Sequence, residues 1–383
     1  MGARRGTATP RRRIRTDHRL RRTGPRRPEG NDTVTRDIRA STITTSRIRT
    51  RVLTCGPDGG TPVLFLHGNL SSATWWESTM ISLPAGYRAI AADQRGFGDA
   101  DPDAKIDATR GLGDLAEDTI ALLDQLGIER AHLVGNSLGG VVAWRLIAEH
   151  ASRWITVTQV DPGSPFGFGS TKDAEGTPCW DDYAGSGAGL INPEFVRLLA
   201  SGDRSTDSMF SPRSMLRTAL LAEPRVLDRE DAIVDAMLAT HLGEHDYPGD
   251  AVESPNWPFV APGVWGPNNA LSPKFTAEAA GVVAAAPKPP ILWIRGAGDR
   301  IVSDASITDL GTLGPTGVIP NYPGADVYPP QPMVAQIRHM LDAYAAAGGT
   351  YEEVVIDRAG HMPFLERPDE FNATFHPYLQ SHG

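Results

Sequence analysis

The most constraining feature of this 383-residue chain is a serine flanked by glycines where a strand meets a helix. Ser137 stands in the run Gly135-Asn-Ser-Leu-Gly139, which Gly140 follows. Residues 132–134 are apolar, as in a buried strand, and residues 138–149 carry apolar side chains at helical spacing. A sharp strand-to-helix turn strains the serine backbone and leaves room only for small neighbours. We therefore predict that Ser137 is a nucleophile; the alternative is a glycine-rich turn with an incidental serine.

The order of apolar runs and helical patterns predicts an α/β fold. Short continuous apolar runs are typical of strands that are covered on both faces, and here they alternate with segments of helical periodicity. The expected strands lie at residues 63–66, 88–92, 132–134, 155–160, 291–294 and 350–357, with a half-buried edge strand at 43–53. The expected helices lie at residues 115–126, 138–149, 333–347 and 368–379. This alternation indicates a doubly wound, mostly parallel sheet.

Interruptions of this rhythm divide the chain into four expected segments. Residues 1–41 are expected to form a disordered, arginine-rich tail, and residues 42–160 the first half of the α/β core. Residues 161–287, rich in Pro, Gly and Trp, are expected to form an inserted, mainly helical cap, with its helices between Pro193 and Leu242. Residues 288–383 complete the core and contain a second insertion at 302–349.

The charge is distributed unevenly along the chain. Residues 1–30 hold eleven arginines and a charge of +9, which leaves -18 for the rest of a chain whose net charge is -9. Such a tail cannot bury enough apolar surface to order itself, although a transit peptide or a misassigned translation start would look similar. The acidic body argues against a nucleic-acid partner. No apolar run of about 18 residues occurs, so we expect no membrane-spanning helix.

The cysteines and most histidines do not indicate a metal site. Cys55 and Cys179 fit neither a metal spacing nor a disulfide framework, and they are compatible with a reducing cytoplasm, which is the location we expect. His241 and His245 lack the residue order of a helical zinc motif, and Gly243 between them weakens a helix. We expect no metal and no organic cofactor, and a small-molecule substrate as the partner. The sequence does not indicate an oligomeric state.

A base and an acid follow Ser137 in the order that this type of site requires. His361 comes after Gly360 and the last expected strand, so it would sit at the carboxyl edge of the sheet. It alone among the histidines combines a strand-end loop with the chain order nucleophile, acid, base. Asp299 follows the strand at 291–294 and is the candidate acid that would orient the imidazole of His361. Asp161, at the end of the strand at 155–160, is the alternative acid.

The candidate oxyanion hole is formed by two backbone amides. Acyl transfer needs N–H donors aimed at the position where negative charge develops. The amide of Leu138 follows the nucleophile directly, and the amide of Asn69 lies in His67-Gly-Asn69, just after the strand at 63–66. An ordinary strand-end turn is the alternative for the second segment. We expect a structural role for the His67 side chain.

Together these motifs resemble the α/β-hydrolase superfamily, over residues 42–160 and 286–383 but not over the cap. The resemblance rests on the runs His67-Gly-Asn69, Asp93-Gln-Arg-Gly-Phe-Gly98, Gly135-Asn-Ser-Leu-Gly-Gly140, Gly296-Ala-Gly-Asp-Arg-Ile-Val302 and Gly360-His-Met-Pro-Phe-Leu-Glu-Arg-Pro368. Within the superfamily, residues 67–69 with Trp75 and Trp76 are similar to the loop of haloalkane dehalogenases and epoxide hydrolases, which use an aspartate nucleophile. Ser137 in that place favours acyl transfer over alkyl-enzyme chemistry. Meta-cleavage C–C hydrolases also carry serine, although their loop is typically richer in glycine, and proline iminopeptidases are more distantly similar.

The expected function is hydrolysis of a carboxylic ester, lactone or related acyl compound through an acyl-enzyme. Two alternatives stay open: C–C bond hydrolysis or perhydrolysis with the same triad, and non-catalytic binding of a small ligand on the hydrolase scaffold. The candidates for lining the substrate pocket are Trp75, Trp76, Trp180 and Trp257, and packing in the cap core is the alternative for the last two. The cap, where specificity would reside, contains no motif that identifies a substrate.

Overall fold

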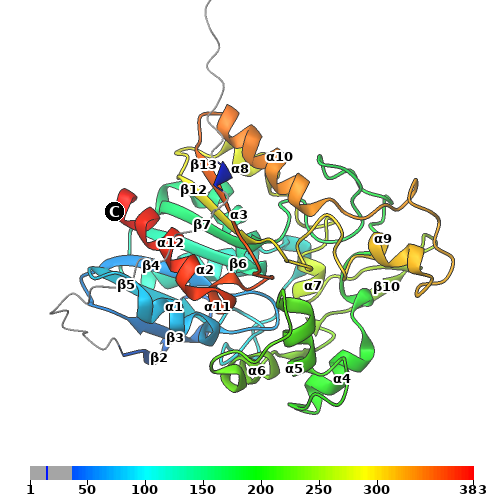
Figure 1. Ribbon diagram of the computed structural model, residues 1–383, viewed down its shortest axis with the longest axis horizontal. Coiled ribbons are helices and arrows are strands. Elements are labelled where there is room, and N and C mark those ends of the chain that lie inside the picture. The colour runs from blue at the N-terminus through cyan, green and yellow to red at the C-terminus, as the bar shows by residue number, and fades with distance from the viewer. Residues whose placement is uncertain (1–13, 16–36) are drawn as a thin grey trace, which may run out of the picture.

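The computed structural model describes residues 14–15 and 37–383, and this part of the chain is built on a nine-stranded sheet (Figure 1). The strand order across the sheet is β1, β13, β12, β7, β6, β4, β5, β3, β2. The strands are β1 (Ile14–Arg15), β2 (Arg39–Thr44), β3 (Arg49–Cys55), β4 (Thr61–Leu66), β5 (Tyr87–Ala92), β6 (Ala131–Ser137), β7 (Trp154–Pro162), β12 (Ile291–Gly296) and β13 (Tyr351–Ile356). Neighbours run parallel from β1 to β5, whereas β3 is antiparallel to both β5 and β2. The doubly wound, mostly parallel sheet expected from the sequence is confirmed.

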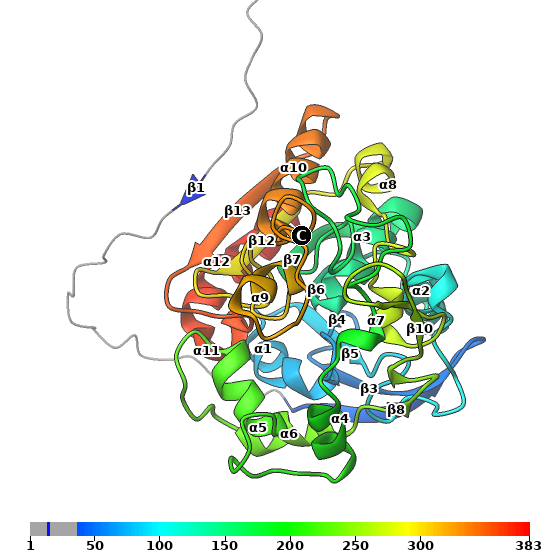
Figure 2. The same cartoon turned by 90° about the vertical axis from the view of Figure 1, so that its right-hand side faces the viewer.

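Helices cover both faces of this sheet (Figure 1, Figure 2). Strand β4 is an example of a strand whose side chains are buried on both faces. Leu64 and Leu66 pack in one core cluster with residues of α2 (Gly113–Gln125), α3 (Leu138–His150), α8 (Ala279–Ala284) and α10 (Met333–Ala346). Val63 and Phe65 pack on the other face with residues of α1 (Glu77–Ser82) and α12 (Pro368–His382). Successive side chains of a strand point to opposite faces, so a sheet buried on both sides requires the continuous apolar run seen here.

The antiparallel edge of the sheet starts earlier than the sequence suggested. The single strand expected at residues 43–53 is a hairpin of β2 and β3, and β2 includes residues 39–41, which we had placed in the tail. The turn forms because the backbone N–H of Thr45 donates to the carbonyl of Ile48 at 2.9 Å, and its hydroxyl accepts from the N–H of Arg47 at 3.1 Å. The polar residues inside the expected strand were therefore a turn signal.

Most of the expected tail lies outside the described residues. This holds for residues 1–13 and 16–36, so the expectation of disorder there stays a prediction. Ile14 and Arg15 form β1, which pairs in parallel with Glu353 and Val354 of β13 at one edge of the sheet.

The cap, residues 161–287, is helical only in its first part. It contains α4 (Pro193–Ala200), α5 (Pro212–Met215), the π-helical turn η5 (Leu216–Leu220) and α6 (Glu230–Leu238), grouped at the bottom of Figure 1. Two small strand pairs follow, β8 (Leu242–Gly243) with β9 (Tyr247–Pro248) and β10 (Ala251–Glu253) with β11 (Val260–Pro262), and then α7 (Pro267–Ala270). Helix α8, which we had assigned to the cap, contributes Ala279 and Val282 to the cluster that packs against the sheet through α3. The segment expected as the cap is therefore mixed in structure, and its last helix, α8, packs with the core.

The second insertion joins the cap to the core. It holds α9 (Leu310–Leu313), the short turn η6 (Gly314–Thr316) and α10. Tyr328, which is fully buried, donates its hydroxyl hydrogen to the carbonyl of Gly185 at 2.8 Å, and its ring lies edge-on to Trp257 at 5.0 Å between centroids. Hydrogen bonding of a buried tyrosine hydroxyl avoids the cost of an unpaired polar group. The residues around Tyr328 thus anchor this insertion to the cap.

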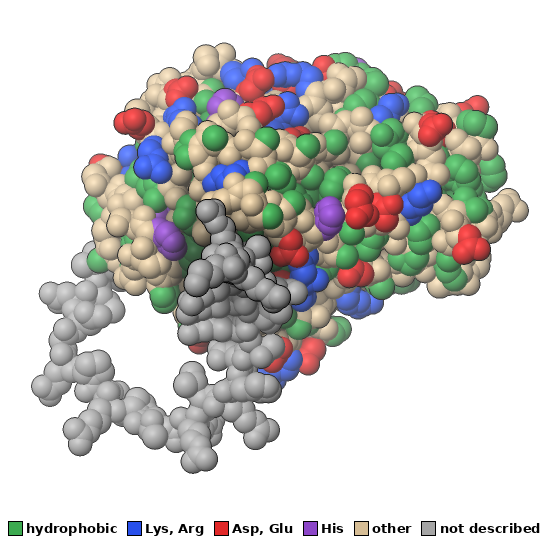
Figure 3. Space-filling view, turned by 90° about the horizontal axis from the view of Figure 1, so that it is seen from above, with side chains coloured by type: hydrophobic (Ala, Val, Ile, Leu, Met, Phe, Trp, Pro, Cys, Tyr) green, Lys and Arg blue, Asp and Glu red, His purple; other side chains and the backbone are tan. Residues whose placement is uncertain are grey.

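Charges of both signs are intermixed on one face of the molecule. On the face shown in Figure 3, acidic and basic side chains lie close to one another and are separated by hydrophobic and uncharged groups. No helix in the described part of the chain combines the length and apolarity needed to cross a membrane.

Candidate active site

Ser137 occupies a strained turn between β6 and α3. Its backbone has φ 54° and ψ -119°, a conformation that non-glycine residues rarely adopt. The chain around it is closely packed: a Cβ on Gly139 would lie 2.4 Å from the carbonyl oxygen of Leu66, and one on Gly140 would lie 2.5 Å from Cβ of Pro162. The glycines of the motif are therefore required by the space available, and the strand–turn–helix context that defines a nucleophile elbow is present.

The ends of β6, β12 and β13 bring the three candidate triad residues to one edge of the sheet. Ser137 ends β6, Asp299 follows the end of β12, and His361 follows the end of β13. The loop of His361 is tied to the elbow, because the side-chain amide of Asn136 donates to the carbonyls of Val160 at 2.9 Å and of His361 at 3.3 Å. Residues separated by more than two hundred positions thus meet at the carboxyl edge, where open α/β sheets hold their ligands.

His361 and Asp299 form a buried hydrogen bond. The distance from Nδ1 of His361 to Oδ2 of Asp299 is 2.9 Å, and the two side chains are 4% and 3% exposed. The other carboxylate oxygen, Oδ1 of Asp299, accepts from the backbone N–H groups of Ile301 at 2.8 Å and Val302 at 3.1 Å. These bonds fix the carboxylate, which in turn orients the imidazole through its Nδ1.

Asp161, the alternative acid, lies beside this pair but is not the direct partner of the imidazole. Its carboxylate accepts from the N–H of Gly296 at 3.0 Å and 3.3 Å. Burial, and next the negative charge of Asp299, raise the pKa of Asp161 well above its usual range. Asp161, Asp299 and His361 also form a group with metal-ligand chemistry in the described residues. Nδ1 of His361 is engaged by Asp299, and the carboxylate of Asp161 by the N–H of Gly296.

Glu366 holds the loop of His361 against the cap, and the sequence analysis did not single it out. One carboxylate oxygen accepts from the N–H of Gly360 at 2.6 Å and the other from the N–H of Ala222 at 2.9 Å. The N–H of His361 donates to the carbonyl of Leu220 at 2.8 Å. The signal was available, because Glu366 belongs to the Gly360–Pro368 run that carried the resemblance to hydrolases.

The loop after β4 is shaped by the His67 side chain. Nδ1 of His67 lies 2.8 Å from the carbonyl of Gly68, and Nε2 accepts from the N–H of Gln94 at 2.9 Å, so the imidazole is neutral with its hydrogen on Nδ1. Burial lowers the pKa of His67 to about 4, which agrees with a neutral ring. The expected structural role of His67 is confirmed.

Asn69 follows in the same loop. Its side-chain amide donates to Oδ1 of Asn268 at 2.9 Å, and its own Oδ1 accepts from the N–H of Leu70 at 3.1 Å. Gly68 lies against the nucleophile, because a Cβ added to it would be 3.1 Å from Cβ of Ser137. The candidate oxyanion loop is therefore adjacent to Ser137, as the sequence predicted for an N–H donor on this side.

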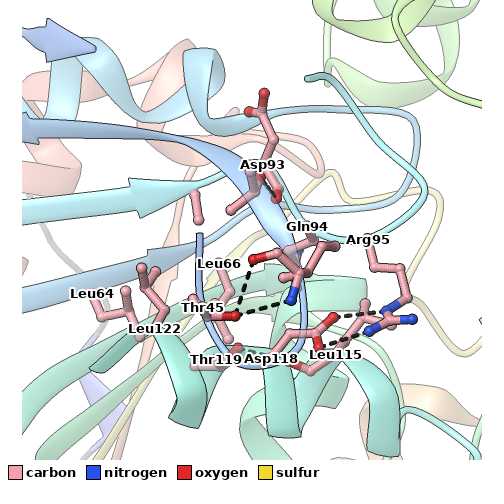
Figure 4. Close-up of a pocket in the computed structure, with 13 residues that line it drawn as sticks. Thr45, Leu64, Leu66, Asp93, Gln94, Arg95, Leu115, Asp118, Thr119 and Leu122 are labelled. Atoms are coloured by element: carbon pink, nitrogen blue, oxygen red, sulfur yellow. Dashed lines mark hydrogen bonds and ion pairs between the residues drawn. The ribbon is translucent and has the colours of Figure 1, made fainter. Parts of the chain in front are cut away.

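A small cavity lies behind this loop, on the side of the sheet covered by α2 (Figure 4). Its volume is about 30 Å³, which suits one water molecule and not a substrate. The ion pair of Arg95 with Asp118, at 2.7 Å, closes it, and Gln94, which bonds His67, lines it. The residues drawn in Figure 4 therefore support the loop from behind and do not form a substrate pocket.

The four tryptophans that we expected in the pocket lie in packed clusters. Trp76 is fully buried and stacks on Phe364 with 4.0 Å between ring centroids, and Trp75 donates its Nε1 hydrogen to the carbonyl of Ile233 at 3.1 Å. Trp257 and Trp180 belong to the cluster that joins the cap to the second insertion. These contacts show what each ring packs against, and the role of the four tryptophans in lining a substrate pocket stays a prediction.

The fold and the strained elbow define a protein of the α/β-hydrolase type. Residues 63–374 match the model of the alpha/beta hydrolase family, and the chain belongs to that family.

Similar proteins carry several different activities in their names. The chain is 37% identical over 116 residues to epoxide hydrolase A of Mycobacterium tuberculosis. This match covers 30% of this chain and 36% of the relative. It is 39% identical over 108 residues to a 2-hydroxy-6-oxo-6-phenylhexa-2,4-dienoate hydrolase of Comamonas testosteroni. This match covers 27% of this chain and 37% of the relative. The crystal structure of a Bacillus subtilis carboxylesterase superposes with a TM-score of 0.55 at 16% identity, over 90% of this chain and 92% of the esterase. The chain thus spans well under half of the length of these curated relatives, and the structural likeness establishes the fold.

Proposed function

We propose that this protein is a serine hydrolase that cleaves a carboxylic ester, a lactone or a related acyl compound through an acyl-enzyme. The observation that carries the proposal is the buried 2.9 Å hydrogen bond between His361 and Asp299, formed at the same sheet edge as the strained turn of Ser137. A nucleophile, a base and a group that orients the base are the parts that hydrolytic serine chemistry requires.

Each residue has a defined part in the proposed reaction. Oγ of Ser137 attacks the acyl carbonyl while Nε2 of His361 takes its proton, and Asp299 stabilises the imidazolium that forms. The imidazolium then protonates the leaving alcohol, which departs and leaves the acyl group on Ser137. Water, deprotonated by His361, attacks the acyl-enzyme, and return of the proton to Oγ releases the acid and restores the enzyme.

Two amides support the negative charge of the tetrahedral intermediate in this mechanism. The N–H of Leu138 belongs to the first turn of α3, where backbone N–H groups have no intrahelical acceptor. The N–H of Asn69 would be the second donor, in the loop that packs against Ser137. Removal of one such donor from an acyl-transfer site typically costs a factor of about 100 to 1,000 in kcat.

The nucleophile favours acyl chemistry over epoxide opening. Epoxide hydrolases, to which the chain is similar over the segment reported above, attack with an aspartate, and an ester intermediate on that carboxylate is then hydrolysed. Ser137 stands at the elbow here, and its alkoxide would form a stable ether with an epoxide carbon, so turnover would stop. Acyl groups on serine, in contrast, are released by water.

The proposal is tested with a fluorophosphonate probe and a substrate panel. The probe should label wild-type protein at Ser137, as located by mass spectrometry of the labelled peptide, and should not label Ser137→Ala. Ser381→Ala, which removes an exposed hydroxyl of α12, is the matched control and should label like wild type. The panel compares p-nitrophenyl esters, lactones, an epoxide and a vinylogous diketone on wild type and Ser137→Ala.

Each outcome decides between the functions that use this site. Ester or lactone turnover that Ser137→Ala abolishes supports the proposal. Turnover of the diketone alone would assign C–C bond hydrolysis, the activity in the name of the Comamonas testosteroni relative. Absence of labelling in folded wild-type protein, together with ligand binding that Ser137→Ala leaves intact, would refute catalysis and favour a binding protein.

A further inference from the structure

Two buried carboxyl groups meet behind the candidate base. As whole residues, Asp161 and Asp299 are 1% and 9% exposed; Asp161 is the second-last residue of β7, and Asp299 follows the adjacent parallel strand β12. One oxygen of each lies within 4.8 Å of the other and of a ring nitrogen of His361. A triad requires one carboxylate at this place, so the second needs an explanation of its own.

The hydrogen bonds distinguish the two groups. Asp299 is bound as a carboxylate, because it accepts from two backbone N–H groups at one oxygen and from His361 at the other. The hydrogen bonds that Asp161 accepts in the described chain come from a single N–H, that of Gly296. Arg295, whose positive charge acts on Asp161, is bound to Glu353 at 2.9 Å.

Two carboxyl groups that are this close together and this well shielded from water are not both ionised. The proton therefore belongs to the carboxyl group with fewer donors, which is Asp161. The titratable and charged groups that face it are Asp299 from the loop after β12, His361 from the loop after β13, and Arg295 from β12 itself. Burial and the charge of Asp299 act together on the pKa of Asp161 and raise it, while Gly296 and Arg295 oppose them.

We infer that Asp161 is a neutral carboxylic acid at neutral pH, and that its O–H donates a hydrogen bond to Asp299 and so positions Asp299 against His361. Asp161 is thus a positioning residue and not a second copy of the catalytic acid. Its effect on the rate rests on the function proposed above, whereas its protonation does not. An asparagine at this position could donate in the same direction through its side-chain amide, and an alanine could not.

The protonation is tested by infrared difference spectroscopy at neutral pH. The spectrum of wild type minus Asp161→Asn should contain the C=O stretching band of a carboxylic acid, and this band should shift on exchange into D₂O. Asp309→Asn is the matched control, because burial raises the pKa of Asp309 only to about 6, so that its loss removes mainly carboxylate bands. Carboxylate bands in the Asp161 difference spectrum would overturn the inference.

The positioning role is tested by the pH dependence of kcat/KM on an acyl substrate. Asp161→Ala should lose about tenfold, because a hydrogen bond to a charged group is removed, and Asp161→Asn should recover to within about threefold of wild type. The acid limb should move to higher pH in Asp161→Ala alone, since an unassisted Asp299 stabilises the imidazolium of His361 more strongly. Equal profiles for both variants, or wild-type behaviour of Asp161→Ala, would overturn the role.

Failure of this inference can be told apart from failure of the proposed function. If wild-type protein cleaves no acyl substrate and takes up no fluorophosphonate, the hydrolase proposal is refuted, and the infrared spectra still decide whether Asp161 carries the proton. If Asp161→Ala does not fold, the spectra and the profile of Asp161→Asn remain, and a tenfold loss in Asp161→Asn would contradict rescue by the amide.

Discussion

Replacement of Gly135 by alanine tests whether the elbow geometry, rather than the mere presence of a serine, produces the activity. Gly135 lies two residues before Ser137 on β6, where the strand passes directly under the first turn of α3. A Cβ at this position would lie 2.4 Å from the carbonyl oxygen of Gly139, 2.7 Å from its carbon and 2.9 Å from Cα of Gly140. All three are backbone atoms, so no side chain can rotate away to make room.

The expected loss follows from the displacement that the methyl group requires. Ordinary contact of a Cβ begins near 3.4 Å, so strand and helix must separate by about 1 Å at this point. A displacement of that size between reacting groups costs about 100-fold in rate, and overpacking in a closely packed region costs about 1–3 kcal/mol of unfolding free energy. We expect Gly135→Ala to lose about two orders of magnitude in the rate of fluorophosphonate labelling while it remains folded at room temperature.

Gly59→Ala is the matched control for the same chemical change. A Cβ on Gly59 would find nothing within 4 Å. Labelling rates are measured for wild type and both variants, with thermal unfolding followed by circular dichroism. Our reasoning is refuted if Gly135→Ala labels as fast as wild type with an unchanged unfolding transition, because the packing distances would then not constrain Ser137.

Three further perturbations act on the base, its loop and the sheet. Asp299→Asn should lower kcat by about three to four orders of magnitude with little change in KM, because the imidazole loses the carboxylate that fixes its tautomer; steady-state kinetics measure this. Glu366→Gln should lower the free energy of unfolding by about 1–3 kcal/mol, because an amide leaves one buried N–H without an acceptor, whereas the exposed Glu370→Gln should not. Burial lowers the pKa of His132 to about 4, so between about pH 6.5 and 4 the unfolded chain binds a proton that the folded chain does not. The free energy of unfolding should therefore decrease as the pH is lowered through this interval, with His132 contributing up to about 3 kcal/mol of the decrease. The decrease should be less steep in His132→Asn, and urea unfolding at several pH values measures it.

Specific results would contradict each of these expectations. Asp299→Asn with a kcat within tenfold of wild type would show that another group orients His361. Equal unfolding free energies for Glu366→Gln and Glu370→Gln would show that the loop of His361 does not depend on the carboxylate. Identical pH slopes for wild type and His132→Asn would show that the buried imidazole takes up its proton in the folded chain as readily as in the unfolded one.

The core strands could be predicted from the sequence because a strand that is buried on both faces needs apolar residues at successive positions. Val63–Leu66 is apolar at every position, and its side chains alternate between two clusters on the two faces of the sheet. The hairpin of β2 and β3 was missed because its strands are half exposed, and residues such as Thr45 and Arg47 fit a strand surface as well as a turn. The cap was only partly predicted, since short strands such as β8 and β10 depend on tertiary contacts more than on periodicity.

The candidate site was predictable as far as its chemistry depends on local motifs. Ser137 and His361 follow strands in runs that restrict the backbone, and parallel topology then brings the strand ends together. The packing partners of the tryptophans could not be predicted, because an aromatic side chain in a core and one in a pocket look the same in a sequence. Glu366 was missed for a different reason: it acts through the backbone N–H groups of Gly360 and Ala222, which any residue provides.

The two hydrogen bonds of Glu366 also connect the segment expected as the cap to the loop of the proposed base. The expected cap is inserted between β7 and β12, far in sequence from His361. Leu220, the last residue of η5, nevertheless accepts from the N–H of His361, and Ala222, two residues further on, is joined through Glu366 to Gly360. A hydrogen-bonded segment cannot shift without moving its partners or leaving buried groups unpaired, which costs about 1–3 kcal/mol for each group. Substitutions in η5 that reshape the cap for another acyl group should therefore change kcat through the position of His361 as well as KM through contact with the substrate. In contrast, substitutions in α4, which packs with Tyr247 in a separate cluster, should act on KM alone.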